Sequence, residues 1–235
     1  MMKAFLLLLL LFGFAVAETQ QVRVLVALCD NETQGIVPVG KAIGNGDDPE
    51  GNLYWGCTDG IAVHFKKTGN WKVVKSERDV SESILRRITF KHTEADIELV
   101  ADAYRGSKMM LCLADFEKAA AGGKYDLVAY IGHNALMDFG ADPPAKVDGN
   151  KTAIVVLCCL SEKYFGKRLR DLGCRPLVMT DQFMYPGSFI LAAAIESWRK
   201  GEGLAEMRHA AGRAYATNQK ISVKAATGVF SKMEE

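Results

Sequence analysis

Several motifs that identify a chemistry are missing from this 235-residue sequence. It has no C-x-x-C and no H-E-x-x-H, so the usual zinc patterns are absent. It has no G-x-S-x-G elbow and no G-x-G-x-x-G fingerprint, which argues against a serine α/β hydrolase and a dinucleotide enzyme. The glycine-rich segment at residues 44–48 lacks the Lys-Ser/Thr of a P-loop and the spaced oxygen ligands of an EF-hand. We therefore expect neither a metal nor a cofactor.

Charge of one sign is also missing. The sequence has 29 Lys and Arg against 28 Asp and Glu, a formal net charge of +1, and no basic run. Nucleic-acid binding depends on clustered positive charge, so we do not expect a nucleic-acid partner.

Long hydrophobic runs are confined to the amino terminus. MMKAFLLLLLLFGFAVAE has one lysine, an apolar stretch and an A-x-A site, the pattern of a signal peptide over residues 1–17. The pattern predicts export to the periplasm or the extracellular space. No later stretch reaches the ~20 apolar residues of a membrane span, so no span is expected.

The rest of the chain, residues 18–235, is predicted to be one α/β domain. Buried strands are expected at 21–29, 127–132, 153–158 and 176–180, and short β-like runs at 61–65, 71–75 and 84–91. Helices are expected at 107–121, 186–200 and 203–219. Strands apolar on both faces that alternate with helices indicate a three-layer α-β-α sandwich with a mostly parallel central sheet.

Two of the predicted strands end in reactive side chains. LVAYIG is followed by His133, and IVVLC by Cys159, 26 residues later. Functional groups gather at the carboxyl ends of parallel strands, where a histidine can activate a thiol. Cys158 and Cys159 alternate to opposite faces if the strand continues, so Cys158 is expected to fill the core. His64, His92 and His209 lack a comparable partner and are expected to be surface or packing residues.

A hydrophobic block ending in His, followed by a block ending in a small residue and Cys, resembles the caspase-like cysteine peptidases. CCLSE is similar to the family's Ala-Cys-x-Ser-Gly form, with Cys158 in the Ala position. The resemblance implies a caspase-like fold, Cys159 as nucleophile and His133 as its proton partner. It also implies an oxyanion site formed by the backbone amides of Asn134 and Cys159. Asn134 stands where the family usually has Gly, and Glu162 follows Ser161 where the family has Gly.

Polar residues near the predicted strand ends are candidates for the substrate cleft: Asp30, Asn31, Ser161, Glu162 and Asp181. Asp30 and Asn31 serve equally well as loop caps. Asp181 could select a basic substrate side chain, a role for which Asp138 and Glu162 compete.

The sequence thus predicts an exported caspase-like cysteine peptidase with a His-Cys dyad, acting on a peptide or protein. The departures at Asn134 and Glu162 motivate an alternative, a non-catalytic caspase-like binding or scaffold protein.

Overall fold

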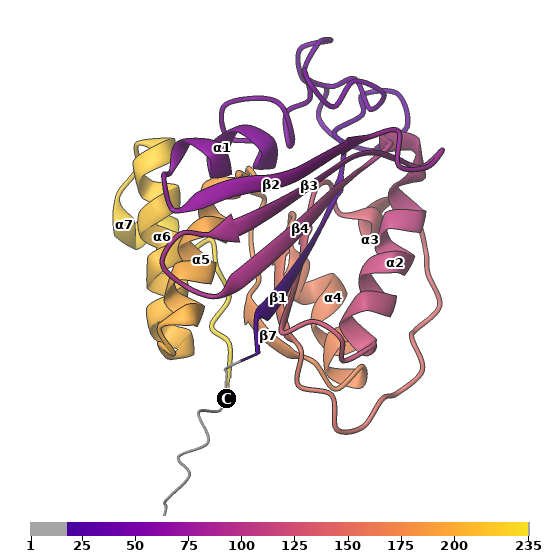
Figure 1. Cartoon of the computed structure of the whole chain (residues 1–235). Helices are drawn as coiled ribbons and strands as arrows, with labels where there is room; N and C mark the ends of the chain where they lie inside the picture. Colours follow the sequence, from indigo (N-terminus) through magenta and orange to yellow (C-terminus); the bar gives the residue numbers. More distant parts are fainter. Residues whose placement is uncertain (1–17, 235) are drawn as a thin grey trace, which may run out of the picture.

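The computed structural model describes residues 18–234, so the predicted signal peptide lies outside the described residues. These residues form an α/β fold around one seven-stranded sheet with the order β2-β3-β4-β1-β5-β6-β7 (Figure 1). The strands are β1 (Gln20–Ala27), β2 (Trp71–Arg78), β3 (Ile84–His92), β4 (Ile97–Tyr104), β5 (Leu127–Ile131), β6 (Ala153–Leu157) and β7 (Arg175–Val178). Pairing is parallel from β4 through β7, and β3 and β2 continue the sheet antiparallel. The predicted mostly parallel α/β sheet is confirmed.

Helices cover both faces of the sheet, which is why its central strands are apolar throughout. The helices are α1 (Ile61–Lys67), α2 (Met109–Ala121), α3 (Ala135–Asp138), α4 (Ser161–Asp171), α5 (Ser188–Arg199), α6 (Leu204–Gln219) and α7 (Val223–Thr227). Figure 1 shows α5, α6 and α7 on one side of the sheet and α2 and α4 on the other. Every residue of β5 and β6 is buried, as a strand covered on both faces requires.

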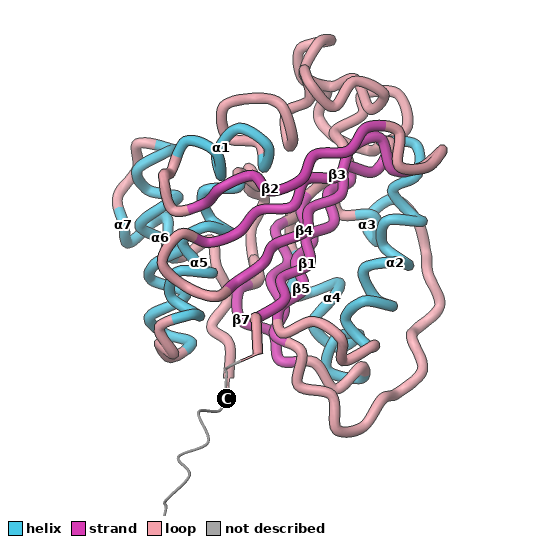
Figure 2. The backbone as a smooth tube through the Cα atoms, in the orientation of Figure 1, coloured by secondary structure: helices cyan, strands magenta, loops and turns pink. Residues whose placement is uncertain are grey.

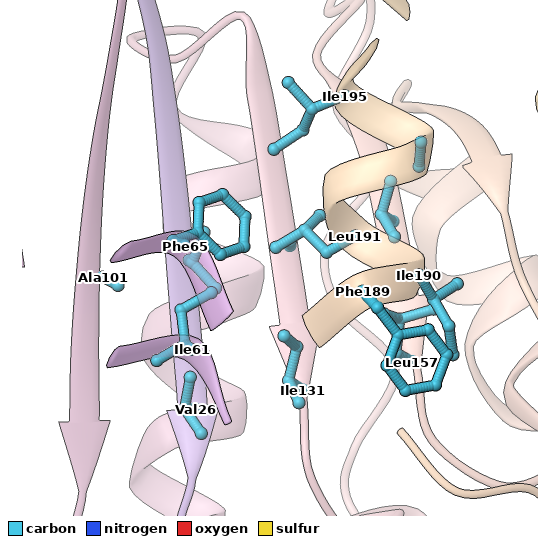
Figure 3. Packing of buried hydrophobic residues seen from close by; sticks show 14 of the residues in the cluster. Val26, Ile61, Phe65, Ala101, Ile131, Leu157, Phe189, Ile190, Leu191 and Ile195 are labelled. Atoms are coloured by element: carbon cyan, nitrogen blue, oxygen red, sulfur yellow. The ribbon is translucent and has the colours of Figure 1, made fainter. Parts of the chain in front are cut away.

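Each face of the sheet has its own hydrophobic core. Val24 and Val26 of β1 belong to one cluster, and the alternating Leu25 and Ala27 belong to the other. In the first cluster, side chains of α1 and α5 lie against strand residues such as Ile131 (Figure 3).

The expected β-like run at 61–65 is wrong, because this segment is helix α1. Its buried residues, Ile61, Ala62 and Phe65, fall on one face of a helix turn, while a strand would bury alternate residues. Strand β4 and helix α4 were not anticipated from the sequence.

The carboxyl edge of the parallel strands is where the chain is least regular. The loop over residues 28–60 lies above the end of β1, at the top of the view in Figure 2. Tyr54 and Trp55 in this loop are buried in the core. Within residues 18–234, none of the helices combines the length and apolar character needed to cross a bilayer.

Candidate functional site

His133 is presented by a constrained turn at the end of β5. The preceding Gly132 has φ of 155°, and a Cβ there would lie 2.9 Å from the carbonyl oxygen of Ala27. Glycine is therefore required for β5 to pass close to β1 as it leaves the sheet. The hydroxyl of Tyr130 donates to the His133 carbonyl at 2.7 Å, which fixes the backbone beyond the turn.

Asp138 holds the His133 ring. Nε2 of His133 lies 3.0 Å from Oδ1 of Asp138, and both side chains are largely buried. A carboxylate only accepts, so Nε2 carries the proton and Nδ1 is the basic nitrogen. Nδ1 has no hydrogen-bond partner among residues 18–234. The sequence interpretation considered Asp138 only for substrate charge; the signal that was missed is a carboxylate five residues after the histidine, across the single turn of α3.

The doubled cysteine at the end of β6 divides between two environments. Cys158 is fully buried in the core, and burial raises the pKa of its thiol well above the ordinary value. Cys159 is half-buried and lines a pocket. Its Sγ accepts from the backbone N–H of Met184 at 3.4 Å and lies 3.6 Å from the Met184 carbonyl oxygen.

A sharp strand-turn-helix connection places Cys159 at the edge of the sheet. Leu160 adopts left-handed angles, φ 54° and ψ 35°, and α4 begins at the next residue. A branched residue in this region is strained, and such strain concentrates at functional sites. The Leu160 amide donates to Gln182 at 3.1 Å, tying the turn to the loop that carries Met184.

The structure brings His133 and Cys159 together on one pocket of about 340 Å³. They come from the ends of β5 and β6, which pair directly in parallel. The other lining residues come from the 28–60 loop, from the turn after β5, from α3 and from the loop before α5: Cys29, Gly35, Ile36, Val37, Val39, Leu53, Tyr54, Gly132, Met137, Phe183, Met184, Tyr185 and Pro186.

Asn134 links the two halves of the site through its side chain. Its Oδ1 caps α3 by accepting from the Leu136 amide at 3.1 Å, and its Nδ2 donates to the Cys159 carbonyl at 2.7 Å. A glycine would supply neither bond. The backbone of Asn134 has ordinary extended angles, φ −78° and ψ 97°. Within residues 18–234, the amides of Asn134 and Cys159 have no acceptor.

None of the five predicted cleft residues lines this pocket, because each is engaged elsewhere. The Asp30 carboxylate accepts from the Glu32 amide and the Thr33 hydroxyl, and Asn31 pairs with the backbone of Val39. Both side chains thus act as loop caps.

The remaining three of those residues lie on the α4 side of the fold or beside the C-terminal segment. Ser161 is fully buried, and its hydroxyl bonds to the Val156 carbonyl and to Thr180. Glu162 pairs with Arg170 at 3.0 Å, and Asp181 accepts from the Ser231 hydroxyl.

His92 is a packing residue, as expected, but it also has a carboxylate partner that the sequence did not indicate. Its Nε2 lies 2.9 Å from Oε1 of Glu196 on α5, and its ring is buried. His64 packs edge-on against Phe65, and burial lowers the pKa of its imidazole. Within residues 18–234, no three His, Cys, Asp or Glu side chains gather as metal ligands.

Comparison with known proteins leaves the site to be interpreted from its own geometry. No protein-family model, curated protein or solved structure matches the chain. The caspase-like resemblance of the two strand-end motifs therefore stays a prediction. What the structure establishes is an α/β fold in which a carboxylate-bound histidine and a half-buried thiol share one pocket at the carboxyl edge of the sheet.

Proposed function

We propose that this chain is an exported, caspase-like cysteine peptidase in which Cys159 is the nucleophile and His133 its proton partner. The observation that carries the proposal is the shared pocket at the ends of two directly paired parallel strands. Asp138 adds support, since it fixes the ring and leaves Nδ1 as the basic nitrogen.

The proposed reaction begins when Nδ1 of His133 takes the thiol proton of Cys159. Sγ attacks the carbonyl carbon of a peptide bond, and the carbonyl oxygen becomes an oxyanion. In this proposal the amides of Asn134 and Cys159, which have no acceptor within residues 18–234, stabilise that oxygen, and the Met184 amide, which donates to the Cys159 sulfur, stabilises the thiolate before attack. The intermediate collapses to a thioester as the imidazolium gives its proton to the leaving amine. Water, deprotonated by His133, then hydrolyses the thioester.

A second candidate, a non-catalytic binding protein on the same fold, is favoured by one contact. The Met184 carbonyl oxygen lies 3.6 Å from the Cys159 sulfur, where it can accept a hydrogen bond from a neutral thiol. A thiol held in this way would remain protonated and inert.

Alkylation of Cys159 distinguishes the two candidates. The protein without residues 1–17 is treated with iodoacetamide at pH 6, and each cysteine is quantified by mass mapping. We expect Cys159 to react fastest, and at least about tenfold more slowly in His133→Gln, because general-base assistance contributes at least that much. His92→Gln is the matched control, since it alters a histidine with an equivalent carboxylate partner away from the pocket. Slow labelling of Cys159 that is unchanged in His133→Gln favours the binding protein.

A further inference from the structure

The pocket around Cys159 has an unusual composition for a site that handles peptides. Among its lining residues, all of which belong to the described part of the chain, there is no Asp, Glu, Lys or Arg. Its walls are made of aliphatic and aromatic side chains, with Ile36, Val37 and Val39 from the 28–60 loop as a first wall and Phe183 and Met184 from the loop before α5 as a second. The only imidazole in the lining is His133.

The carboxylates beside the lining residues are hydrogen-bonded within the protein; Asp59, next to Tyr185, accepts from the Asn218 side chain at 3.0 Å. Asp138 uses Oδ1 for His133 and Oδ2 for the Gly35 amide at 2.7 Å. Asp30 is buried and accepts from its own loop. Within residues 18–234, the lining itself therefore offers no carboxylate or ammonium group to pair with a charged substrate side chain.

Two apolar side chains at the pocket are exposed to water without any structural benefit. Val37 is 87% exposed and Phe183 is 71% exposed, and both belong to the lining. Exposed large apolar groups beside a pocket indicate a binding surface. Binding of an apolar ligand group would remove these two side chains from water, and this burial would stabilise the complex.

Hydrogen bonds hold both walls in place, and those of the second wall include one to the reactive thiol. The first wall is anchored where Asp138 accepts from Gly35 and where Asn31 makes two bonds with the backbone of Val39, at 2.9 and 3.0 Å. The second is anchored where the Met184 amide donates to the Cys159 sulfur. The pocket is thus preformed around the thiol, as ligand sites usually are.

We infer that this pocket selects a large apolar side chain, such as Leu, Met or Phe, on the residue whose carbonyl is attacked. The inference rests on the proposed function, because that residue stays bound to Sγ in the thioester and must occupy the space beside it. The pocket has a volume of about 340 Å³, at the small end of the ~300–1,000 Å³ range of ligand pockets. A pocket of this size suits one side chain.

The test uses fluorogenic peptides that differ only in the residue before the cleaved amide: Leu, Phe, Asp or Arg. We expect kcat/KM for Leu and Phe to exceed that for Asp and Arg at least about a hundredfold, because a charge would enter an apolar site unpaired. Val37→Asp should lower the Leu-to-Arg ratio at least about tenfold. Val74→Asp, on the exposed edge strand β2, is the matched control and should leave the ratio unchanged.

A second measurement separates failure of the inference from failure of the function. The rate of Cys159 alkylation is compared for neutral iodoacetamide and anionic iodoacetate, and the neutral reagent should react faster. A His133-dependent reaction that favours the anion, or peptides with Asp or Arg cleaved best, overturns the apolar specificity and leaves the peptidase intact. An unreactive Cys159 and no cleavage of any peptide overturn both.

Discussion

Residues 18–234 contain two histidine–carboxylate pairs of nearly equal geometry at opposite ends of the sheet. His133 lies 3.0 Å from Asp138, and His92 lies 2.9 Å from Glu196. His133 follows β5 at the carboxyl edge of the parallel strands. His92 ends β3, which runs antiparallel, and Lys91 and Glu98 pair beside the start of β1. His92 therefore lies at the amino edge.

The second ring nitrogen distinguishes the two pairs. Nδ1 of His92 accepts from the Glu94 amide at 3.1 Å, so both of its ring nitrogens are occupied. The ring also packs edge-on against Trp71, with 4.8 Å between the two ring centroids. Nδ1 of His133 has no partner within residues 18–234, and its ring borders a pocket shared with a thiol. A carboxylate partner alone therefore does not distinguish a packing histidine from a reactive one. A histidine is available for chemistry when one ring nitrogen is held by a hydrogen bond and the other is left free.

The strongest test of this comparison changes each histidine to glutamine. In His133→Gln the amide can still donate to Asp138 but provides no base, so peptide hydrolysis should fall by about 10²–10⁴-fold. In His92→Gln hydrolysis should persist, and the free energy of unfolding should fall by about 1–3 kcal/mol because the Glu94 amide loses its acceptor. Hydrolysis rates and urea unfolding are measured for both variants. If the two histidines exchange these effects, the distinction is wrong.

A smaller effect is expected from the two carboxylates. In Asp138→Asn a single amide oxygen replaces two carboxylate oxygens, so it cannot accept both from the Gly35 amide and from Nε2 of His133, and kcat should fall at least about tenfold with KM little changed. Glu196→Gln should leave both constants as they are, since Glu196 contacts no pocket residue that the site uses. A change confined to KM in Asp138→Asn would show that Asp138 acts on the Gly35 loop and not on the imidazole.

The smallest effect is the pH dependence of the free energy of unfolding, which arises from buried thiols. Burial raises the pKa of Cys29 and of Cys174 from 9.0 to about 11. Below pH 9 both thiols are protonated whether the chain is folded or unfolded. Between pH 9 and 11 the unfolded chain releases protons that the folded chain retains, so stability falls as the pH rises. Urea midpoints measured from pH 8 to 10.5 should decline, and less steeply in Cys29→Ala; an equal slope in that variant would contradict the assignment.

Much of the sheet could be predicted from the sequence because its central strands are buried on both faces. Such strands appear as continuous apolar runs, as in LVAYI and IVVL. The segment at 61–65 misled because five residues are too short to separate a helical from an alternating pattern. Strand β4 was missed since IELVADAY carries acidic residues, and one of them, Asp102, is buried with Arg23 and Arg87 as partners. Pairing of this kind is a tertiary property.

At the site, the sequence predicted which strand ends meet but not which polar side chains face the pocket. Asp138 and the wall loops depend on how residues 35–39 fold back over the sheet, a contact between segments about a hundred residues apart. Glu162 and Asp181 are candidates in the sequence because they follow strand ends. In the structure Glu162 pairs with Arg170, and Asp181 accepts from Ser231 of the C-terminal segment. Whether a surface carboxylate faces the pocket depends on which groups lie beside it in the folded chain, and no sequence motif specifies those groups.

The doubled cysteine has one more consequence, which concerns alignment of β6 with its neighbours. Residues along this strand alternate between the two cores, with Val155 and Leu157 in one and Ile154, Val156 and Cys158 in the other. A slip of one residue would turn every side chain to the opposite face, and in one direction it would carry Cys158 into the place of Cys159. The reactive thiol is therefore chosen by backbone pairing and not by its chemical identity. A chain that mispaired in that direction would present Cys158 at the pocket in place of Cys159. Its backbone would no longer offer the Cys159 carbonyl to the Asn134 side chain.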